Sequence, residues 1–403
     1  MIDIINVDNL FPEGTFYRFN NPKFGYTLNL GDFVRYHFEH NLCNAPDYKN
    51  DSYVFLVICN PNQLPSSDPY QFFKPLLDTV KDSTKLNIVI SYPMETFVPE
   101  IVKYMAEYLS SIYEKANFFF SFGNALKCTE YVKAKVIDRV ECIPNPLFEI
   151  LFGDYIRNND IKLTEKTKLS KKFLFPIRNA KPFRMFLYLW ARDNNILDNS
   201  YYSWTTESVY FSASLLYTTE MWNIDFQKNK EFLEIPVSLD PEDLREYNQK
   251  QWFLPPELVD SSFMQIVCET TFVETLEKNN PTMFLTEKTY KPIFYKQPFI
   301  LVSEPYSLRY LRSLGYKTFG SFIDESYDEI EDPIERMKHI TNEILKINSM
   351  SLEQLEDIRI KIQDIVEHNH SLFMSRPSEK ILVKHIEETL LYGKQRSIKL
   401  ISE

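Results

Sequence analysis

The stretch from residue 283 to residue 303, MFLTEKTYKPIFYKQPFILVS, constrains the fold more than any other part of the sequence. A polar, charged loop leads into a short helical pattern, and an apolar run that is typical of a buried strand follows. Glu287 and Lys288 then lie where the loop enters the helix. Free backbone N–H groups and the positive end of the helix dipole attract anions at such a place. The stretch therefore predicts a phosphate-binding position.

Proline sets the predicted start of this helix. Pro292 has no backbone N–H, so it is tolerated in the first turn of a helix but breaks the hydrogen-bond ladder further along. We therefore expect Thr289, rather than Thr286, to be the N-cap. Lys288 would then lie immediately before the helix.

The same region resembles the donor-binding signature of fucosyltransferase-type enzymes, in which a strand ending in Glu and small polar residues precedes Thr-Glu-Lys. Here FMQIVCETTF at 263–272 precedes LTEK at 285–288. A longer pattern is similar to glycosyltransferase-like proteins of large phages and viruses, and it comprises FLFPIRNAKPFR at 173–184, NILDNSYYS at 195–203, KP and QPFI at 291–300 and SLRYLRSLGYKTF at 307–319. The resemblance spans residues 171 to 340. The sequence departs from the fucosyltransferase pattern at Pro292 and at Thr270, where Asn is usual.

This resemblance implies a sugar-nucleotide glycosyltransferase of the GT-B type, an α/β protein with two Rossmann-like domains. It implies that Glu269, Thr270, Glu287 and Lys288 bind the donor, with Glu287 hydrogen-bonded to the ribose or the sugar. The stereochemistry of transfer is left open by the resemblance, as are the donor's base and sugar.

The diphosphate of such a donor needs cations, and the sequence limits where they come from. Only 8 glycines occur, without a Gly-x-Gly-x-x-Gly or Gly-Lys-Ser/Thr loop, and no Asp-x-Asp pair is present to clamp a metal. Side-chain cations are the remaining candidates, because guanidinium and ammonium groups bind phosphate oxygens directly. We expect Arg178, Arg184 and Lys288 to hold the diphosphate, without a metal or other cofactor.

A catalytic base would take the proton from the acceptor hydroxyl. Glu95 follows a predicted buried strand in the first half of the chain and is the best-placed carboxylate. Asp32, His37 and His40 are the alternatives. His368 and His370 lack the spacing and the neighbouring cysteines of a zinc site.

Each candidate also has a structural explanation. Arg178 follows an apolar strand and could be solvated, and Arg184 begins a helix, where a cation is unfavourable unless an anion is near. Glu287 could simply complement the helix dipole. Glu269 and Thr270 end a buried strand and could hydrogen-bond to the next loop.

Composition restricts the class of protein. With 403 residues, of which 44% are hydrophobic and 15% aromatic, the chain is long enough for two packed domains. No apolar run is long enough for a membrane span and no leader begins the chain, so we expect a soluble, cytoplasmic protein. The five cysteines are isolated, which predicts reduced core thiols. A net charge of −11 argues against general coating of a polyanion.

The alternation of apolar runs and helical patterns predicts three regions: an acceptor-side domain over 1–165, a donor-binding domain over 173–340 and a helical tail over 341–403 that packs across both. Strands are predicted at 53–59, 86–91, 118–122, 136–143, 173–177, 235–237, 264–268 and 299–303. Helices are predicted at 98–114, 184–194, 307–314, 333–347, 352–367 and 378–391. The lysine-rich segment 162–172 has no apolar period and is predicted to be a linker.

The leading acceptor is a hydroxymethylated base of phage DNA, which the likeness to phage proteins and the basic segment favour. Lysines of 162–172, with Lys181, would then contact DNA phosphates. A glycan or protein hydroxyl is the alternative acceptor. A non-catalytic nucleotide-binding or assembly protein with the same fold is the alternative from another class. A phosphoryl-transfer enzyme is a third option, but the sequence lacks the glycine loop that such an enzyme needs.

Overall fold

The structure is a computed structural model. It describes residues 2–6, 52–57, 86–92, 107, 117–122, 140–144, 147–159, 161–177, 180–204, 221–239, 254–272 and 284–376. The chain forms two compact units, of which the first comprises Met1–Ile150, Asn280–Met283 and Pro377–Glu403, and the second Leu151–Asn279 and Phe284–Arg376. Parallel sheets and helices make it an α/β protein, as predicted.

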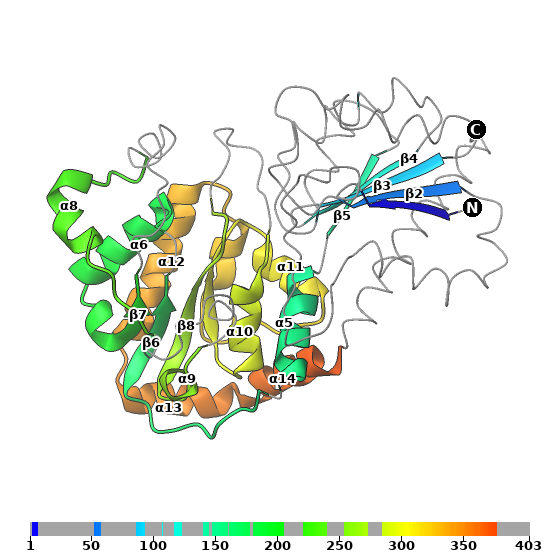
Figure 1. Cartoon of the computed structure of the whole chain (residues 1–403). Helices are drawn as coiled ribbons and strands as arrows, with labels where there is room; N and C mark the ends of the chain where they lie inside the picture. Colours follow the sequence, from blue (N-terminus) through cyan, green and yellow to red (C-terminus); the bar gives the residue numbers. More distant parts are fainter. Residues whose placement is uncertain are drawn as a thin grey trace. The chain divides into compact units, whose positions relative to one another are not determined.

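The first unit contains a five-stranded parallel sheet whose order follows the chain (Figure 1). Its strands are β1 (Ile2–Asn6), β2 (Ser52–Val57), β3 (Leu86–Tyr92), β4 (Asn117–Phe122) and β5 (Val140–Pro144). Strands β2 to β5 confirm the four predicted strands of this half, and β1 was not predicted. The predicted helix over 98–114 lies outside the described residues except for residue 107, which is helical.

The second unit contains a four-stranded parallel sheet with the order β7-β6-β8-β9. Its strands are β6 (Lys171–Pro176), β7 (Ser200–Ser203), β8 (Ser262–Cys268) and β9 (Phe299–Val302). Every residue of β8 is buried, as expected for a central strand of a parallel sheet. The chain moves one way from β6 to β7 and the opposite way from β8 to β9, so its direction reverses between the adjacent strands β6 and β8.

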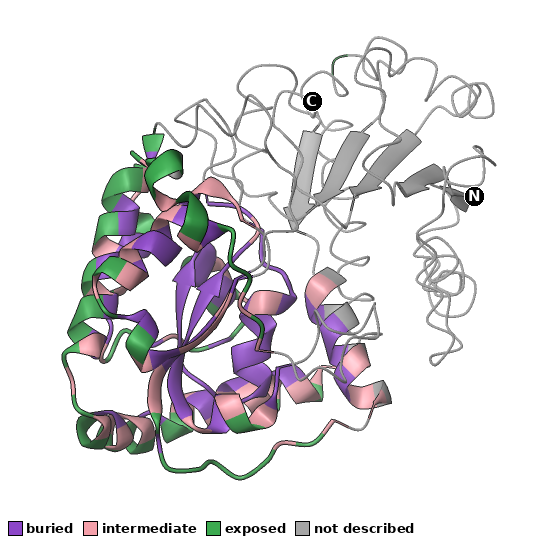
Figure 2. Cartoon of the chain, turned by 60° about the vertical axis from the view of Figure 1, so that its left-hand side comes forward, coloured by how far each residue is buried: buried purple, intermediate pink, exposed green. Residues whose placement is uncertain are grey.

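Nine helices of the described residues follow these strands or flank them. They are α5 (Leu147–Asn158), α6 (Pro182–Asp193), α8 (Phe226–Leu233), α9 (Pro256–Asp260), α10 (Glu287–Phe294), α11 (Ser307–Ser313), α12 (Pro333–Asn348), α13 (Leu352–Lys361) and α14 (Gln363–Ser375). In the second unit, the residues of the strands and of the helix faces turned toward them are buried, and the outward helix faces are exposed (Figure 2). The core of this unit is therefore the sheet and its helical cover.

Local sequence explains where the last helices begin. Asp332 accepts a hydrogen bond from the backbone N–H of Glu335, and Pro333 occupies the first position of α12, where its missing N–H costs nothing. Ser351 and Gln354 form a capping box at the start of α13. Both helices begin where the sequence predicted, and the predicted helix over 352–367 is divided at Ile362 into α13 and α14.

The last three helices are part of the second unit and pack on its sheet and on α10. Helix α12 contacts β9, α13 contacts β6 and β8, and α14 contacts α10. The predicted boundary of the tail at residue 341 falls inside α12. Whether the tail also covers the first unit stays a prediction, and the helix predicted over 378–391 lies outside the described residues.

One prediction for the second unit is wrong, and a helix beside it was not predicted. The strand predicted at 235–237 is a single bridge between Val237 and Trp204. Helix α8, which precedes this bridge, was not predicted. Trp204 donates its indole N–H to Leu233 O (2.8 Å), and its ring stacks on Tyr188 with centroids 4.5 Å apart. These contacts fix the 233–237 segment beside β7 without a ladder of strand hydrogen bonds.

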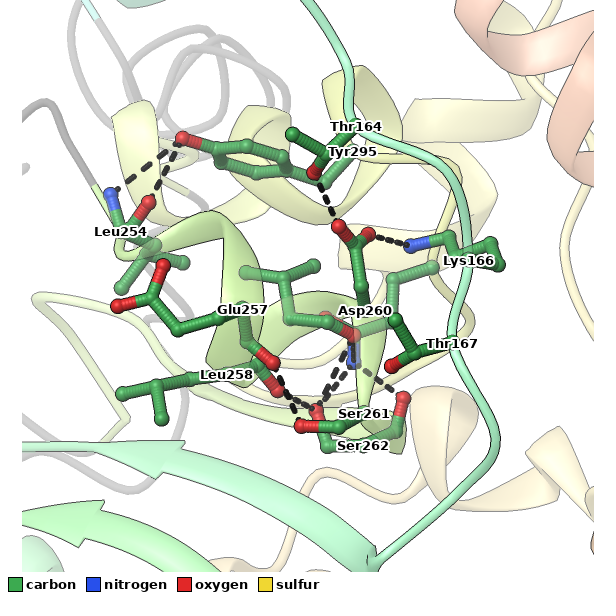
Figure 3. Close-up of polar contacts among 12 residues, drawn as sticks. Thr164, Lys166, Thr167, Leu254, Glu257, Leu258, Asp260, Ser261, Ser262 and Tyr295 are labelled. Carbon is green, nitrogen blue, oxygen red and sulfur yellow. Dashed lines mark hydrogen bonds and ion pairs between the residues drawn. The ribbon is translucent and has the colours of Figure 1, made fainter.

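The lysine-rich segment passes beside α9 and the start of β8 (Figure 3), and the backbone N–H groups of Ser170 and Lys171 donate to Ser261 O. Lys166 Nζ lies 3.1 Å from Asp260 Oδ1, and Thr164 donates to the other oxygen of the same carboxylate. Leu169 N donates to Glu356 Oε1 of α13 (2.9 Å). The segment is therefore bound to the second unit rather than being a free tether.

In the described part of the chain, none of the helices combines the length and apolar composition that crossing a bilayer requires.

Candidate functional site

The candidate site lies at the carboxyl ends of β6 and β8, where the direction of the chain reverses. Loops leaving two adjacent parallel strands in opposite directions leave room for a ligand outside the sheet edge, and open α/β folds bind ligands there. The loop after β8 begins with Glu269 and Thr270, and the loop after β6 leads to Lys181 and α6. Helix α10 begins near the same edge, because Thr286 hydrogen-bonds to Glu269.

Glu269 organises this edge from inside the protein. Its side chain is 0% exposed, and its two oxygens accept four hydrogen bonds. The donors are Thr286 N (2.9 Å) and Thr289 Oγ1 (2.5 Å) to Oε1, and Thr286 Oγ1 (2.7 Å) and Thr270 N (3.2 Å) to Oε2. Glu269 thus makes the hydrogen bonds to the next loop that the sequence predicted as the structural alternative to donor binding. It holds α10 against the end of β8.

The same bonds correct the predicted start of α10. The N-cap is Thr286, whose hydroxyl accepts from Lys288 N (3.4 Å), and the helix begins at Glu287. Thr289 is not the cap, because its hydroxyl donates to Glu269. Pro292 is tolerated inside this helix of 8 residues because it removes only one ladder bond, and the bonds from Thr286 and Thr289 offset that loss.

Lys288 therefore lies in the first turn of α10, and its ammonium is a partly exposed cation at this edge. Its Nζ lies 3.1 Å from Glu287 Oε1, 3.0 Å from Thr286 Oγ1 and 3.4 Å from Thr270 Oγ1, and its side chain is 29% exposed. The structure thus brings together three predicted site residues: Thr270, Glu287 and Lys288. A cation on a helix N-terminus with a hydroxyl beside it can bind a phosphate oxygen.

Glu287 is almost fully buried next to this cation. Burial alone raises the pKa of its carboxyl group, but the charges of Lys288 and Lys291, together with hydrogen bonds from Lys288 and from the backbone N–H of Glu287, lower that pKa below its ordinary value. Glu287 is therefore ionised at neutral pH. An ionised, fixed carboxylate can accept hydrogen bonds from ligand hydroxyl groups.

Arg184 is part of the site's support. It is the third residue of α6, it is buried, and its Nη2 donates to Cys268 O (3.1 Å) and Glu269 O (2.5 Å). Lys181, just before α6, donates to Thr270 O (2.7 Å). The structure thus places Arg184 against the backbone after β8. Two other predicted site residues, Arg178 and Glu95, lie outside the described residues, as do Asp32, His37 and His40.

Sequence reasoning missed Arg336 in α12, whose Nη2 donates to Phe272 O (2.7 Å). No local motif marks this residue. The available signal was its spacing of four residues from Ile340 and eight from Ile344, which places Arg336 on the apolar face of its helix.

Cys268, the last residue of β8, is a buried free thiol. Burial raises its pKa to about 12, so the thiol stays protonated and unreactive. This agrees with the predicted core role for Cys268. Cys142 lies in β5, and Cys43, Cys59 and Cys128 lie outside the described residues.

Over the ranges that the structure describes, no three His, Cys, Asp or Glu side chains are grouped so that they could hold a metal ion.

No protein-family model matches the chain, and a search of curated proteins found no match either.

Proposed function

We propose that the protein is a glycosyltransferase that binds a nucleotide-sugar donor at the carboxyl edge of the second sheet. One observation carries this proposal. The two segments that resemble a donor-binding signature, 263–272 and 285–288, are brought together by Glu269 at the β6–β8 reversal. Parallel α/β sheets bind nucleotides at such a reversal. The sequence resemblance and the topology therefore favour the same position.

The described residues have distinct roles in this proposal. Lys288 and the first turn of α10 bind the diphosphate, and the hydroxyl of Thr270 is 3.4 Å from the same ammonium. Glu287 accepts a hydrogen bond from a ribose or sugar hydroxyl. Arg184 donates through Nη2 to two backbone carbonyls, and its contact with the diphosphate stays a prediction. Arg178 as a further phosphate ligand and Glu95 as the base stay predictions.

The GT-B arrangement and the acceptor rest on the sequence resemblance. A hydroxymethylated base of phage DNA is the leading acceptor, and a glycan or protein hydroxyl is the alternative. The lysine-rich segment lies at the amino ends of the strands, whereas the proposed donor site lies at their carboxyl ends. Lysines of this segment would therefore hold DNA away from the donor. The seven residues of β8 separate the two edges by roughly 20 Å.

Three lysines of that segment are also engaged within the chain. Lys166 pairs with Asp260, Lys171 donates to Asp198 O (2.6 Å) and Lys172 donates to Asn348 O (2.5 Å). We therefore propose that DNA, if it is the acceptor, contacts other parts of the chain.

Calorimetry with UDP, GDP and CMP, each with and without EDTA, tests the donor site. We expect at least one nucleotide to bind in EDTA, and Lys288→Ala to weaken its binding. Lys168→Ala, at an exposed lysine of the amino edge, is the matched control and should bind as the wild type does. Failure of all three nucleotides to bind would overturn the proposal.

Turnover separates transfer from binding. Candidate sugar nucleotides are incubated with hydroxymethylated DNA, plain DNA and free saccharides, and nucleoside and glycan masses are measured. A mass gain on any acceptor supports a glycosyltransferase and identifies the acceptor. Tight nucleotide binding without transfer to any acceptor would favour the non-catalytic alternative.

A further inference from the structure

The turn that follows β8, residues 268–272, has its carbonyl groups bound by buried or half-buried basic side chains. The bonds are Arg184 Nη2 to Cys268 O (3.1 Å) and Glu269 O (2.5 Å), Lys181 Nζ to Thr270 O (2.7 Å), and Arg336 Nη2 to Phe272 O (2.7 Å). We call Lys181, Arg184 and Arg336 the carbonyl clamp. Its members come from both sides of the turn in sequence, two at the start of α6 and one from α12.

Arg336 is the most deeply buried member of the carbonyl clamp, with 1% of its surface exposed. Its Nη1 donates to Ile330 O (2.7 Å) and Glu331 O (3.1 Å), and its guanidinium lies 4.3 Å from the centre of the Phe272 ring. Burial lowers its pKa to about 10, which still leaves it charged at neutral pH. A buried charge is costly unless it is paired or hydrogen-bonded, and here three carbonyls and a ring contact the guanidinium, although its Nε has no hydrogen-bond partner among the described residues.

The turn that the carbonyl clamp holds also carries part of the candidate site. Thr270 lies within it, and the hydroxyl of Thr270 is 3.4 Å from Lys288 Nζ. The backbone N–H of Thr270 donates to Glu269, which in turn holds Thr286 at the start of α10. A shift of the turn would therefore move Thr270 relative to Lys288 and disturb the bonds that hold α10.

We infer that Arg336 is a positioning residue that ties α12 to the 268–272 turn and so sets the alignment of Thr270 with Lys288. Its effect on ligand binding rests on the proposed function, whereas its effect on the turn does not. The planar guanidinium reaches carbonyls on two different segments at once. Lys181 and Arg184 fix the same turn from α6, so the carbonyl clamp acts as one device.

Three variants test this inference. Arg336→Lys keeps the charge and loses the planar fork, so one ammonium cannot serve Phe272, Ile330 and Glu331 together. Lys181→Met removes the bond to Thr270 O, and because Lys181 is half-buried the change leaves the buried core intact. Lys338→Met is the control, because Lys338 lies on α12 two residues from Arg336 with its side chain 66% exposed.

Amide hydrogen exchange measures the opening of the turn without a ligand, and calorimetry with UDP and GDP measures nucleotide affinity. For Arg336→Lys and Lys181→Met we expect exchange at 269–272 to become faster relative to β9. We also expect nucleotide affinity to fall by about tenfold, the effect of losing one charge-assisted hydrogen bond. Lys338→Met should change neither. Affinity is measured where every variant is more than nine-tenths folded, so a purely structural effect does not alter it.

Unchanged exchange in both variants would show that the carbonyl clamp does not fix the turn. Faster exchange with wild-type affinity would overturn the positioning role. If the wild type binds no nucleotide, the proposed function fails and the binding role of Arg336 fails with it, while exchange alone decides whether the clamp holds the turn.

Discussion

The first sheet follows the order β1-β2-β3-β4-β5, whereas the second follows β7-β6-β8-β9. In the first, each described strand lies beside the strand that precedes it, so the chain moves across the sheet in one direction. In the second, the direction reverses between β6 and β8. Both sheets are parallel and both confirm the predicted α/β class, but only the second has a reversal among its described strands.

This difference shows that apolar runs predict where strands lie, whereas the strand order determines where a binding edge lies. The sequence of each half predicts buried parallel strands, and by that criterion the halves look alike. A binding edge depends on neighbouring connections that diverge, which a local pattern does not contain. The second unit is therefore an α/β unit with a parallel sheet and a reversal of chain direction, and the two Rossmann-like domains in a GT-B arrangement stay a prediction.

The largest expected effect is the loss of stability when Glu269, at the edge of the second sheet, is replaced. Glu269→Ala removes the acceptor for four buried or half-buried donors, and we expect the second unit to lose about 3–5 kcal/mol of unfolding free energy. All four tryptophans, at 190, 204, 222 and 252, lie in the second unit, so urea unfolding followed by tryptophan fluorescence reports this unit. Glu231→Ala, at an exposed position of α8, is the control. A loss below about 1 kcal/mol would mean that Glu269 does not organise the edge.

A bound nucleotide should slow hydrogen exchange in the second sheet and not in the first. At a concentration one hundred times the dissociation constant, binding stabilises the native state by about 2.7 kcal/mol. Hydrogen exchange should therefore slow at 269–272 and 284–288 and throughout the core of the second unit. The strands of the first sheet should keep their ligand-free rates. Equal or greater slowing at the carboxyl ends of β1 to β5 would show that strand order does not locate the nucleotide.

Lys288 tests the same edge with one side chain. Lys288→Ala should weaken nucleoside diphosphate binding by about 2 kcal/mol, the scale of a hydrogen bond to a charged group. Circular dichroism should stay native because the ammonium is partly exposed. The effect should decrease as salt rises, since salt screens exposed charges. Wild-type affinity in this variant would make Lys288 a surface partner of Glu287 and nothing more.

The sequence predicted the elements of the second unit better than their contacts. Strands β6, β8 and β9 lie within one or two residues of their predictions, because apolar runs bounded by turn residues are local signals. The N-cap of α10 was predicted wrongly, because the proline rule is local and could not include a buried carboxylate from 17 residues away. Arg336 is still further away in sequence, 64 residues from its partner Phe272. Such pairings depend on the strand order, which the sequence did not reveal.

The smallest expected effect concerns the other end of α10, where α14 packs. His370 Nδ1 lies 2.6 Å from Phe294 O, the last residue of α10. Burial lowers the pKa of His370 below its ordinary value near 6.5, and Lys296 lowers it further, while the bond to Phe294 and the charge of Glu367 oppose these shifts. The folded state therefore favours the neutral ring.

The sign of the pH dependence follows from this shift. As pH falls, the unfolded chain binds the proton first, so the contribution of His370 is complete above about pH 6.5 and is lost as pH drops through the lower, folded pKa. Between pH 7.5 and pH 5.5 we expect the melting temperature of the second unit, followed by tryptophan fluorescence, to fall.

His370→Gln should reduce that fall, because an amide can still donate to Phe294 O and does not titrate in this range. Glu367 does not interfere in this window. Its hydrogen bond to Lys296 lowers its pKa below 4.5, so its own contribution is lost only at more acidic pH. His339→Gln, at an exposed histidine of α12, is the control. If His370→Gln kept the full pH dependence, the contact between α14 and α10 would not be the source, and the second unit's acid sensitivity would have to come from another group.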